Sequence, residues 1–263
     1  MNVESSRQPV LFLGHGSPMN AIEDNSFTRS LARLGERLGK PKAVLCVSAH
    51  WLTEGTRVTG MPKPRTIHDF GGFPEALYDV RYPAPGSPEL AALVRETLGR
   101  KTVGIDDTEW GLDHGAWSVL RHLYPKADVP VVQLGIDYAL PAARHFELGE
   151  TLRPLRDKGI LILGSGNIVH NLRRVSFDEN AAPEAWAAEF DEWVKRRLEK
   201  RDYESLLADL AGAPSGALSV PTPDHYDPLL YILGASDARD KLRFEYEGIQ
   251  NGSISMRSLS FGA

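Results

Sequence analysis

The chain has 263 residues and a formal net charge of −5 at pH 7; 42% of its residues are hydrophobic and 25% are charged. This length fits one large α/β domain, and the hydrophobic share is enough for a sizeable core, so the composition excludes a disordered chain. A slightly acidic chain lacks the basic surface that binds phosphate backbones, and no uncharged apolar run is long enough to cross a bilayer, so we expect neither nucleic acid nor a membrane as a partner.

Short apolar runs alternate along the chain with longer segments of helical periodicity. In chain order, the predicted elements are a strand from Val10 (VLFLG), a helix from Phe27 (FTRSLARLGERL), a strand from Ala43 (AVLCVSA), a helix from Ser87 (SPELAALVRETL), a strand from Val129 (VPVVQLG), a helix from Pro141 (PAARHFELGETLRPLR), a strand from Ile160 (ILILG), a helix from Ala182 (APEAWAAEFDEWVKRRLEK) and edge strands in the tail from Phe244 and Ser253. The four internal strands are apolar on both faces, as parallel strands covered by helices must be. We therefore predict a single domain over residues 1–263, a three-layer α/β/α fold with a mostly parallel central sheet.

The single cysteine and the start of the chain indicate a cellular compartment. Cys46 cannot form an internal disulfide, and its place inside an apolar run predicts a packed core side chain. The start, MNVESSRQPV, lacks the long apolar core of a secretory signal. We therefore expect a cytoplasmic protein.

Histidines follow three of the predicted strands. His15 and His50 come directly after apolar runs, and His170 lies six residues beyond ILILG. Because ligands of open α/β sheets bind outside the carboxyl ends of the strands, these imidazoles can converge there. A single such histidine often bonds only to a carbonyl or to water, but glycine and serine surround all three and let other groups approach the backbone. The joint pattern predicts a metal site, with His225 in the proline-rich segment PTPDHYDPLL as a fourth candidate ligand.

The other histidines divide into two groups. His122 and His145 lie in helical segments without small neighbours, so we expect ordinary structural roles for them. His68 in TIHDFGGFP and His114 in WGLDHGAW lie among glycines, aromatics and a carboxylate, a composition suited to the wall of a pocket for a flat ligand or to a structured surface loop. In either segment the adjacent carboxylate, Asp69 or Asp113, is a candidate to orient its neighbouring imidazole.

Seven segments, six of which contain one of these histidines, follow one another from about Val10 to the C-terminus: FLGHGSPMN, VSAHW, TIHDFGGFP, LYDVRYPAPG, WGLDHGAW, GSGNIVHNLR and PTPDHYDPLLY. Together they resemble the motif series of the 4,5-DOPA extradiol dioxygenase family, within the class III extradiol ring-cleavage superfamily that also holds the catalytic subunits of protocatechuate 4,5-dioxygenase. The combination is far more specific than any one of its pieces.

The resemblance implies a role for each histidine. His15 and His50 would be the first two metal ligands, and His225 would occupy the third protein position. His170 resembles the active-site base and, when zinc is bound, lies near enough to the metal to be a fourth ligand. His114 would hydrogen-bond the substrate or the species derived from oxygen, and His68 resembles, more weakly, a substrate-pocket residue.

The predicted ligand set departs from the wider class III pattern of two histidines and a glutamate. His225 stands where the carboxylate is expected, and Asp224 and Asp227 remain rival ligands. Three neutral imidazoles would leave the full charge of a divalent ion in place, which favours binding of an anionic catecholate. The same ligand set also suits zinc.

The resemblance implies a non-haem dioxygenase that cleaves the ring of a DOPA-like catechol with O2 to a ring-opened semialdehyde. Fe(II) is the metal expected for turnover, and Zn(II) could occupy the same site. The implied partners are the small-molecule catechol and O2, with the chain a monomer or a small homo-oligomer. Two alternatives stay open: a zinc-dependent hydrolase that uses the same histidines to activate water, and a non-catalytic binder of a metal or small ligand.

Overall fold

Eight strands form the central sheet of the computed structural model, which describes residues 7–178 and 181–263. Their order is β4-β3-β5-β2-β6-β1-β10-β7, and the middle four pair parallel to one another. These four are β5 (Val131–Asp137), β2 (Ala43–Thr53), β6 (Ile160–Gly166) and β1 (Val10–Gly14). They correspond to the four predicted internal strands, and their carboxyl ends share one edge of the sheet.

Shorter strands extend the sheet on both sides. β3 (Thr56–Thr59) pairs antiparallel with β5, and β4 (Val103–Asp106) pairs with β3; both are too short to produce a clear apolar pattern, and we did not predict them. In the tail, β7 (Leu242–Tyr246) is an edge strand as expected, but β10 (Ser258–Phe261) lies between β1 and β7. A separate ribbon consists of β8 (Ile249–Gln250) and β9 (Ile254–Ser255).

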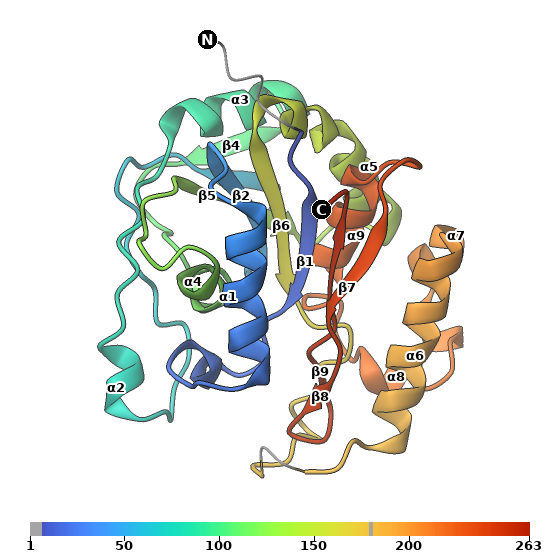
Figure 1. Ribbon diagram of the computed structural model, residues 1–263. Helices are drawn as coiled ribbons and strands as arrows, with labels where there is room; N and C mark the ends of the chain where they lie inside the picture. The colour runs from blue at the N-terminus through green and yellow to red at the C-terminus, as the bar shows by residue number, and fades with distance from the viewer. Residues whose placement is uncertain (1–6, 179–180) are drawn as a thin grey trace.

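Helices cover both faces of the sheet (Figure 1). One face packs against α1 (Ser26–Leu38) and α4 (His114–Leu123). The other packs against α3 (Pro88–Leu98), α5 (Ala142–Leu152) and α9 (Asp227–Ala235). Within β1, alternate side chains belong to different cores, since successive residues of a strand point to opposite faces. The predicted three-layer α/β/α fold is confirmed.

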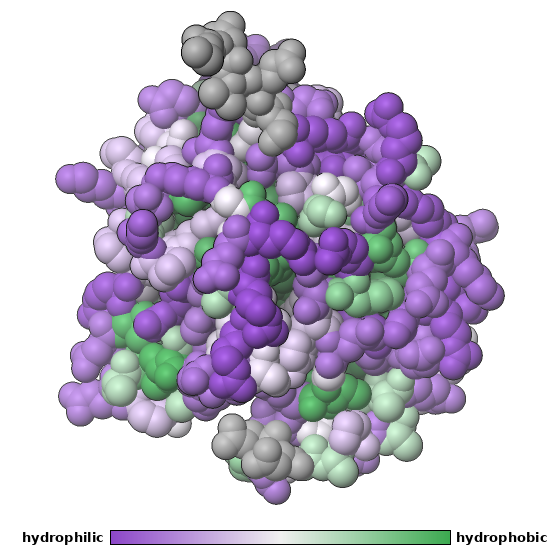
Figure 2. All heavy atoms as spheres, in the orientation of Figure 1, coloured by the Kyte–Doolittle hydropathy of each residue, from purple (hydrophilic) through white to green (hydrophobic). Residues whose placement is uncertain are grey.

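The remaining helical segments lie around these layers. They are η1 (Pro18–Ala21), α2 (Glu75–Tyr78), η2 (Arg153–Lys158), α6 (Ala185–Lys200), α7 (Tyr203–Leu207), η3 (Leu210–Gly212) and α8 (Gly216–Ser219). Among the described residues, no helix has the length and apolar composition needed to cross a bilayer. The face drawn in Figure 2 is mostly hydrophilic, with hydrophobic side chains scattered over it in small groups.

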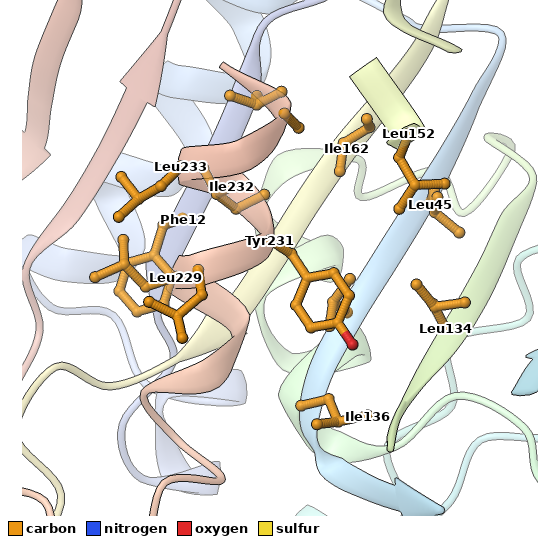
Figure 3. Close-up of a cluster of buried hydrophobic side chains, with 14 of the residues drawn as sticks. Phe12, Leu45, Leu134, Ile136, Leu152, Ile162, Leu229, Tyr231, Ile232 and Leu233 are labelled. Carbon is orange, nitrogen blue, oxygen red and sulfur yellow. The ribbon is translucent and has the colours of Figure 1, made fainter. Parts of the chain in front are cut away.

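Helix α9 was not predicted from the sequence. Its segment reads as a proline-rich loop, but Pro228 stands in the first turn, where the missing N–H costs no hydrogen bond. Every residue of α9 is buried, so the helix has no polar face and shows no amphipathic period. Leu229 and Ile232 lie with side chains of β1 and β6 in one hydrophobic cluster (Figure 3). This packing fixes the start of α9, and with it the segment that carries His225.

We predict that Gly234→Ala lowers the free energy of unfolding by about 1–3 kcal/mol, because it overpacks the contact between α5 and α9. A Cβ on Gly234 would lie 2.0 Å from the Phe146 carbonyl oxygen, and one on Gly149 would lie 2.2 Å from the Tyr231 carbonyl oxygen. Urea unfolding measures the change. Gly212→Ala is the control, since no atom lies within 4 Å of its added Cβ; equal effects of the two variants would contradict the prediction.

Candidate metal centre

Five histidines from separate elements meet at the carboxyl edge of the parallel strands. His15 follows β1 directly, and His170 lies four residues beyond the end of β6. His50 is inside β2, which continues to Thr53, so the strand does not end at this histidine as predicted. The pairing of β2 with β5 shifts register between Val47 and Leu52, around His50. The other two are His114, the first residue of α4, and His225, two residues before α9.

The imidazoles lie within a few ångströms of one another. The Nε2 atoms of His15 and His50 are 3.0 Å apart. The His225 ring centroid is 5.3 Å from that of His15 and 5.0 Å from that of His50, and the His50 and His114 centroids are 3.9 Å apart. His170 stacks on His225 with centroids 3.5 Å apart and an interplanar angle of 7°. The structure thus brings together every histidine to which the sequence assigned a ligand or catalytic role.

A hydrogen-bond chain through Ser165 determines the tautomer of His15. The Ser165 hydroxyl donates to the Gly115 carbonyl oxygen at 2.6 Å, so it can only accept from His15 Nδ1, which is 3.0 Å away. The proton of His15 therefore lies on Nδ1, and Nε2 presents a lone pair to the cluster. We did not single out Ser165 from the sequence; its place in GSGN, directly after the predicted apolar run ILILG and inside β6, was the available signal.

A single carboxylate, that of Asp69, contacts both His50 and His114. Its Oδ1 accepts from the His114 backbone N–H at 2.9 Å, and its Oδ2 lies 2.9 Å from His114 Nδ1 and 3.4 Å from His50 Nδ1. Although burial raises the pKa of Asp69, the hydrogen bonds from His114 outweigh burial and hold it below its ordinary value. Asp69 therefore orients imidazoles that are distant in the sequence. The sequence had suggested instead that it orients the imidazole of its neighbour, His68.

His225 receives a similar partner from the adjacent residue. Its Nδ1 lies 2.5 Å from Asp224 Oδ2, so Nδ1 donates, and its Nε2 is buried with no hydrogen-bond partner in the part of the chain that the structure describes. Asp227, the other rival ligand, lies with Oδ2 at 3.6 Å from His145 Nε2. Burial, followed by the charge of Asp224, raises the pKa of Asp227 to about 7. Asp224 thus accepts a hydrogen bond from His225, and Asp227 contacts the imidazole of His145 instead.

These contacts bring ring nitrogens of separate histidines face to face, an arrangement that can bind a cation. The Nε2 atoms of His15 and His50 lie 3.0 Å apart, and His15 offers a lone pair in a buried site. Two nitrogens bound to one metal ion at about 2.0–2.1 Å lie about 2.9–3.4 Å apart for angles between 90° and the tetrahedral value, a range that includes the observed 3.0 Å. Burial, followed by the neighbouring imidazoles, lowers the pKa of both histidines well below the ordinary value. The neutral form that binds a metal is therefore the one present at neutral pH.

Two glycines allow these elements to approach closely. A Cβ on Gly166 would lie 2.2 Å from the His225 carbonyl oxygen, so a side chain there would push the His225 segment away from β6. A Cβ on Gly115 would lie 2.5 Å from Ser48 Oγ and 2.8 Å from His50 Cδ2. The small residues around the histidines therefore do permit the close backbone contacts that their pattern suggested.

Asp113 anchors the first turn of α4, rather than orienting the His114 ring. Its Oδ1 accepts from the Ala116 backbone N–H at 3.1 Å, which caps the helix, and from Ser48 Oγ on β2 at 2.7 Å. Its Oδ2 accepts from Gln133 Nε2 on β5 at 2.7 Å. Burial, followed by the charge of Asp69, raises the pKa of Asp113. The helix that carries His114 is thereby held against two strands.

His68 belongs to an aromatic group beside the histidine cluster. Its ring centroid lies 5.7 Å from Phe70 and 5.6 Å from Trp117, and Phe70 in turn lies 5.5 Å from His114. Its Nε2 is 3.1 Å from the Val80 carbonyl oxygen. His68 is therefore near the cluster and outside it.

The two histidines expected to be structural also lie outside the cluster. His122 Nε2 donates to the Asn20 carbonyl oxygen at 2.8 Å. His145 is buried, and its Nδ1 lies 3.0 Å from the Tyr231 hydroxyl. Each of these imidazoles thus makes a hydrogen bond to a residue outside the cluster.

Ser165→Ala is expected to weaken Zn2+ binding about 10–100-fold, the usual effect of losing a group that orients a metal-binding histidine. The change removes the acceptor for His15 Nδ1 and allows the ring to rotate or change tautomer. Competition with a chromophoric chelator measures the affinity. Ser236→Ala removes a comparably buried hydroxyl, bonded to the Leu233 carbonyl oxygen at 2.7 Å, and should leave the affinity unchanged.

Comparisons with known proteins find relatives along nearly the whole chain. The chain is 52% identical over 262 residues to 4,5-DOPA dioxygenase extradiol of Escherichia coli strain K12, covering 99% of this chain and 97% of that protein. It is 38% identical over 268 residues to 4,5-DOPA dioxygenase extradiol of Beta vulgaris, covering 99% of each. The crystal structure of an uncharacterized Escherichia coli K12 protein superposes with a TM-score of 0.85 at 48% identity, covering 97% of this chain and all of that one.

A family model agrees with these relatives. The model described as the catalytic LigB subunit of aromatic ring-opening dioxygenase matches residues 9–257, which include all five clustered histidines. The resemblance read from the seven sequence motifs is thereby confirmed, and the chain belongs to the LigB family of aromatic ring-opening dioxygenases.

Proposed function

We propose that residues 1–263 form one catalytic domain that opens the ring of a DOPA-like catechol with O2 and releases a ring-opened semialdehyde. The family match and the relatives named 4,5-DOPA dioxygenase extradiol support this reaction. The observation that carries the proposal is the set of Nε2 atoms: those of His15 and His50 lie 3.0 Å apart, and that of His225 is buried with no hydrogen-bond partner among the described residues. Together they suit one divalent ion.

We assign His15, His50 and His225 as the metal ligands, with Fe(II) for turnover and Zn(II) as a possible occupant. A bound ferrous ion would leave adjacent positions for the two oxygens of a catechol and for O2, and would pass electron density from the ring to oxygen. Three neutral imidazole ligands would leave the full charge of the ion in place, which would favour an anionic diol. Each ligand is oriented by a different acceptor: Ser165, Asp69 and Asp224 respectively.

We assign His170 as the base that takes a proton from a catechol hydroxyl. Burial, followed by His225, lowers the pKa of His170 to about 3, so its ring is neutral and able to accept a proton. An anionic catecholate beside it would raise that pKa and stabilise the protonated form. His170 also lies close enough to His225 to be a fourth ligand when zinc is bound. His114 would hydrogen-bond the substrate through Nε2, since its Nδ1 is held by Asp69.

The aromatic ring of the substrate would lie against the aromatic group that includes His68 and Phe70, since flat side chains stack on a flat ligand. Beside the loop that follows His15, a cavity of ≈ 300 Å³ is available for ring substituents. Its lining residues include Met19, Phe73 and Gln250. The partners in this proposal are one small catechol and O2, with the chain acting as a monomer or a small homo-oligomer.

Oxygen uptake tests the proposal. The protein is loaded with Fe(II) without air, then exposed to oxygen-18 gas with DOPA, caffeate, protocatechuate or gallate. We expect oxygen consumption, a yellow product and both labelled atoms in that product, all abolished by His15→Ala. Hydrolysis of an ester or amide without oxygen uptake would support the zinc hydrolase instead, and catechol binding without turnover would support a non-catalytic binder.

A further inference from the structure

The loop that carries Asp69 is held firmly against the start of α4. The Ile67 backbone N–H donates to the Leu112 carbonyl oxygen at 2.7 Å, and the Trp117 indole N–H donates to the Ile67 carbonyl oxygen at 2.7 Å. Thr66 and Leu112 also form an isolated bridge. These contacts lie within three residues of Asp69 and tie its position to the helix that presents His114. The carboxylate is therefore placed by the fold and is 16% exposed.

One carboxylate then faces three nitrogen atoms. The two 2.9 Å contacts, from the backbone N–H and Nδ1 of His114, are ordinary hydrogen bonds, and Asp69 Oδ2 also lies 3.4 Å from His50 Nδ1. A carboxylate only accepts, so His114 holds its proton on Nδ1, and Asp69 Oδ2 is an acceptor within reach of His50 Nδ1. We infer, resting on the proposed function, that Asp69 is a positioning residue that fixes the tautomers of His50 and His114 together, so that both present an unprotonated Nε2 to the metal centre.

This assignment makes Asp69→Asn an informative substitution, because asparagine has nearly the same shape but one oxygen and one NH2 group. If the asparagine oxygen keeps the bond to the His114 backbone N–H, its NH2 group faces the Nδ1 atoms of both imidazoles. Two donors would then oppose each other, and a ring relieves the conflict by moving its proton to Nε2. His50 would lose the lone pair that it offers to a metal, and His114 would change from an acceptor to a donor at Nε2.

The inference is tested on the full chain by measuring histidine tautomers and Zn2+ affinity, neither of which requires an assay of ring cleavage. Long-range 1H–15N spectra of the wild-type protein should show His50 and His114 protonated at Nδ1. In Asp69→Asn, at least one of the two should be protonated at Nε2, and Zn2+ affinity should fall about 10–100-fold in chelator competition. Asp79→Asn is the matched control: it makes the same substitution ten residues further along, at the end of α2, and among the described residues no imidazole ion pair involves its carboxylate.

The inference has two independent ways to fail. A proton on Nε2 of His50 or His114 in the wild-type protein would overturn it even if Asp69→Asn did not fold. A folded Asp69→Asn chain with wild-type tautomers and wild-type Zn2+ affinity would overturn it as well. If no catechol supports oxygen uptake, the proposed function fails but these measurements are unaffected, since Zn2+ alone is the probe. Conversely, intact ring cleavage with the wrong tautomers would reject only the role of Asp69.

Discussion

Replacing His170 by alanine is expected to lower turnover of a catechol about 10²–10⁴-fold while leaving the metal content of the protein near the wild-type level. The reason is its position: His170 stacks on the proposed ligand His225, and its neutral ring is free to accept a proton. The Nε2 atoms of the proposed ligands His15 and His50 lie 3.0 Å apart, and His170 takes no part in that contact. Oxygen uptake at saturating Fe(II) measures turnover, and elemental analysis measures the bound metal.

The comparison with His15→Ala separates a base from a ligand. His15→Ala should lose both metal and activity, because it removes one of the two nitrogens that lie 3.0 Å apart. Equal metal loss from His170→Ala and His15→Ala would make His170 primarily a ligand. Unfolding curves of both variants without metal serve as the stability control, since neither change should alter the packing of the sheet.

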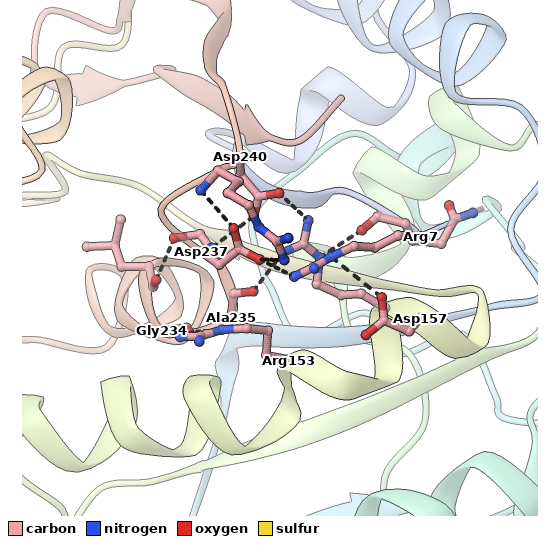
Figure 4. A network of polar contacts seen from close by, with 12 residues as sticks. Arg7, Arg153, Asp157, Gly234, Ala235, Asp237 and Asp240 are labelled. Carbon is pink, nitrogen blue, oxygen red and sulfur yellow. Dashed lines mark hydrogen bonds and ion pairs between the residues drawn. The ribbon is translucent and has the colours of Figure 1, made fainter. Parts of the chain in front are cut away.

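Asp240→Asn is expected to lower the free energy of unfolding by about 3–5 kcal/mol at pH 7, because it leaves a buried guanidinium unpaired. Arg156 Nη1 lies 2.6 Å from Asp240 Oδ2, and Nη2 lies 3.0 Å from Oδ1, with side-chain exposures of 1% and 10%. Asp240 also accepts from the Asp237 backbone N–H, and Arg7 pairs with Asp237 (Figure 4). Urea unfolding of the variant measures the loss.

The pH dependence of this loss has a defined sign. Burial raises the pKa of Asp240, but the hydrogen bonds from Arg156 and the Asp237 backbone outweigh it and hold the pKa below 3.8. A carboxyl with a lowered folded-state pKa contributes its stability above the unfolded pKa and loses it as pH falls through the folded value. The difference between wild type and Asp240→Asn should therefore be constant from pH 7 to about 5 and shrink below about 4.

An exposed ion pair provides the comparison. Asp128 pairs with Lys40 at 2.8 Å, with side-chain exposures of 49% and 56%, so water screens the pair. Asp128→Asn should change the unfolding free energy little. If it cost as much as Asp240→Asn, burial would not be the source of the effect.

The resemblance to a family and the strand pattern predicted much of the fold, and the reasons are local. The runs at Val10, Ala43 and Ile160 are apolar on both faces, which only a covered parallel strand requires, and they form β1, β2 and β6. Ser87 and Pro88 marked the start of α3 through cap chemistry that depends on neighbouring residues alone. By contrast, α9 is apolar all round, so its burial removed the periodicity that identifies a surface helix.

In the candidate site, the histidines were predictable from the sequence and their hydrogen-bond partners were not. Histidines at strand ends could be selected from the sequence, since the carboxyl edge of a parallel sheet collects them. Their partners could not: Asp69 lies next to His68 in the chain but holds His114 and His50 in the structure. Ser165 looked like a residue of a small-residue loop, yet it determines the tautomer of His15.

Residue order alone was therefore enough to indicate the layers, the strands and the imidazoles, because apolar periodicity, capping and strand ends are properties of neighbours in the chain. Which carboxylate meets which ring, and that Arg156 is buried against Asp240, followed from the folded arrangement. Hydrogen bonds act over about 3 Å between groups that lie tens of residues apart, so their partners exist only once the sheet and its helices have packed.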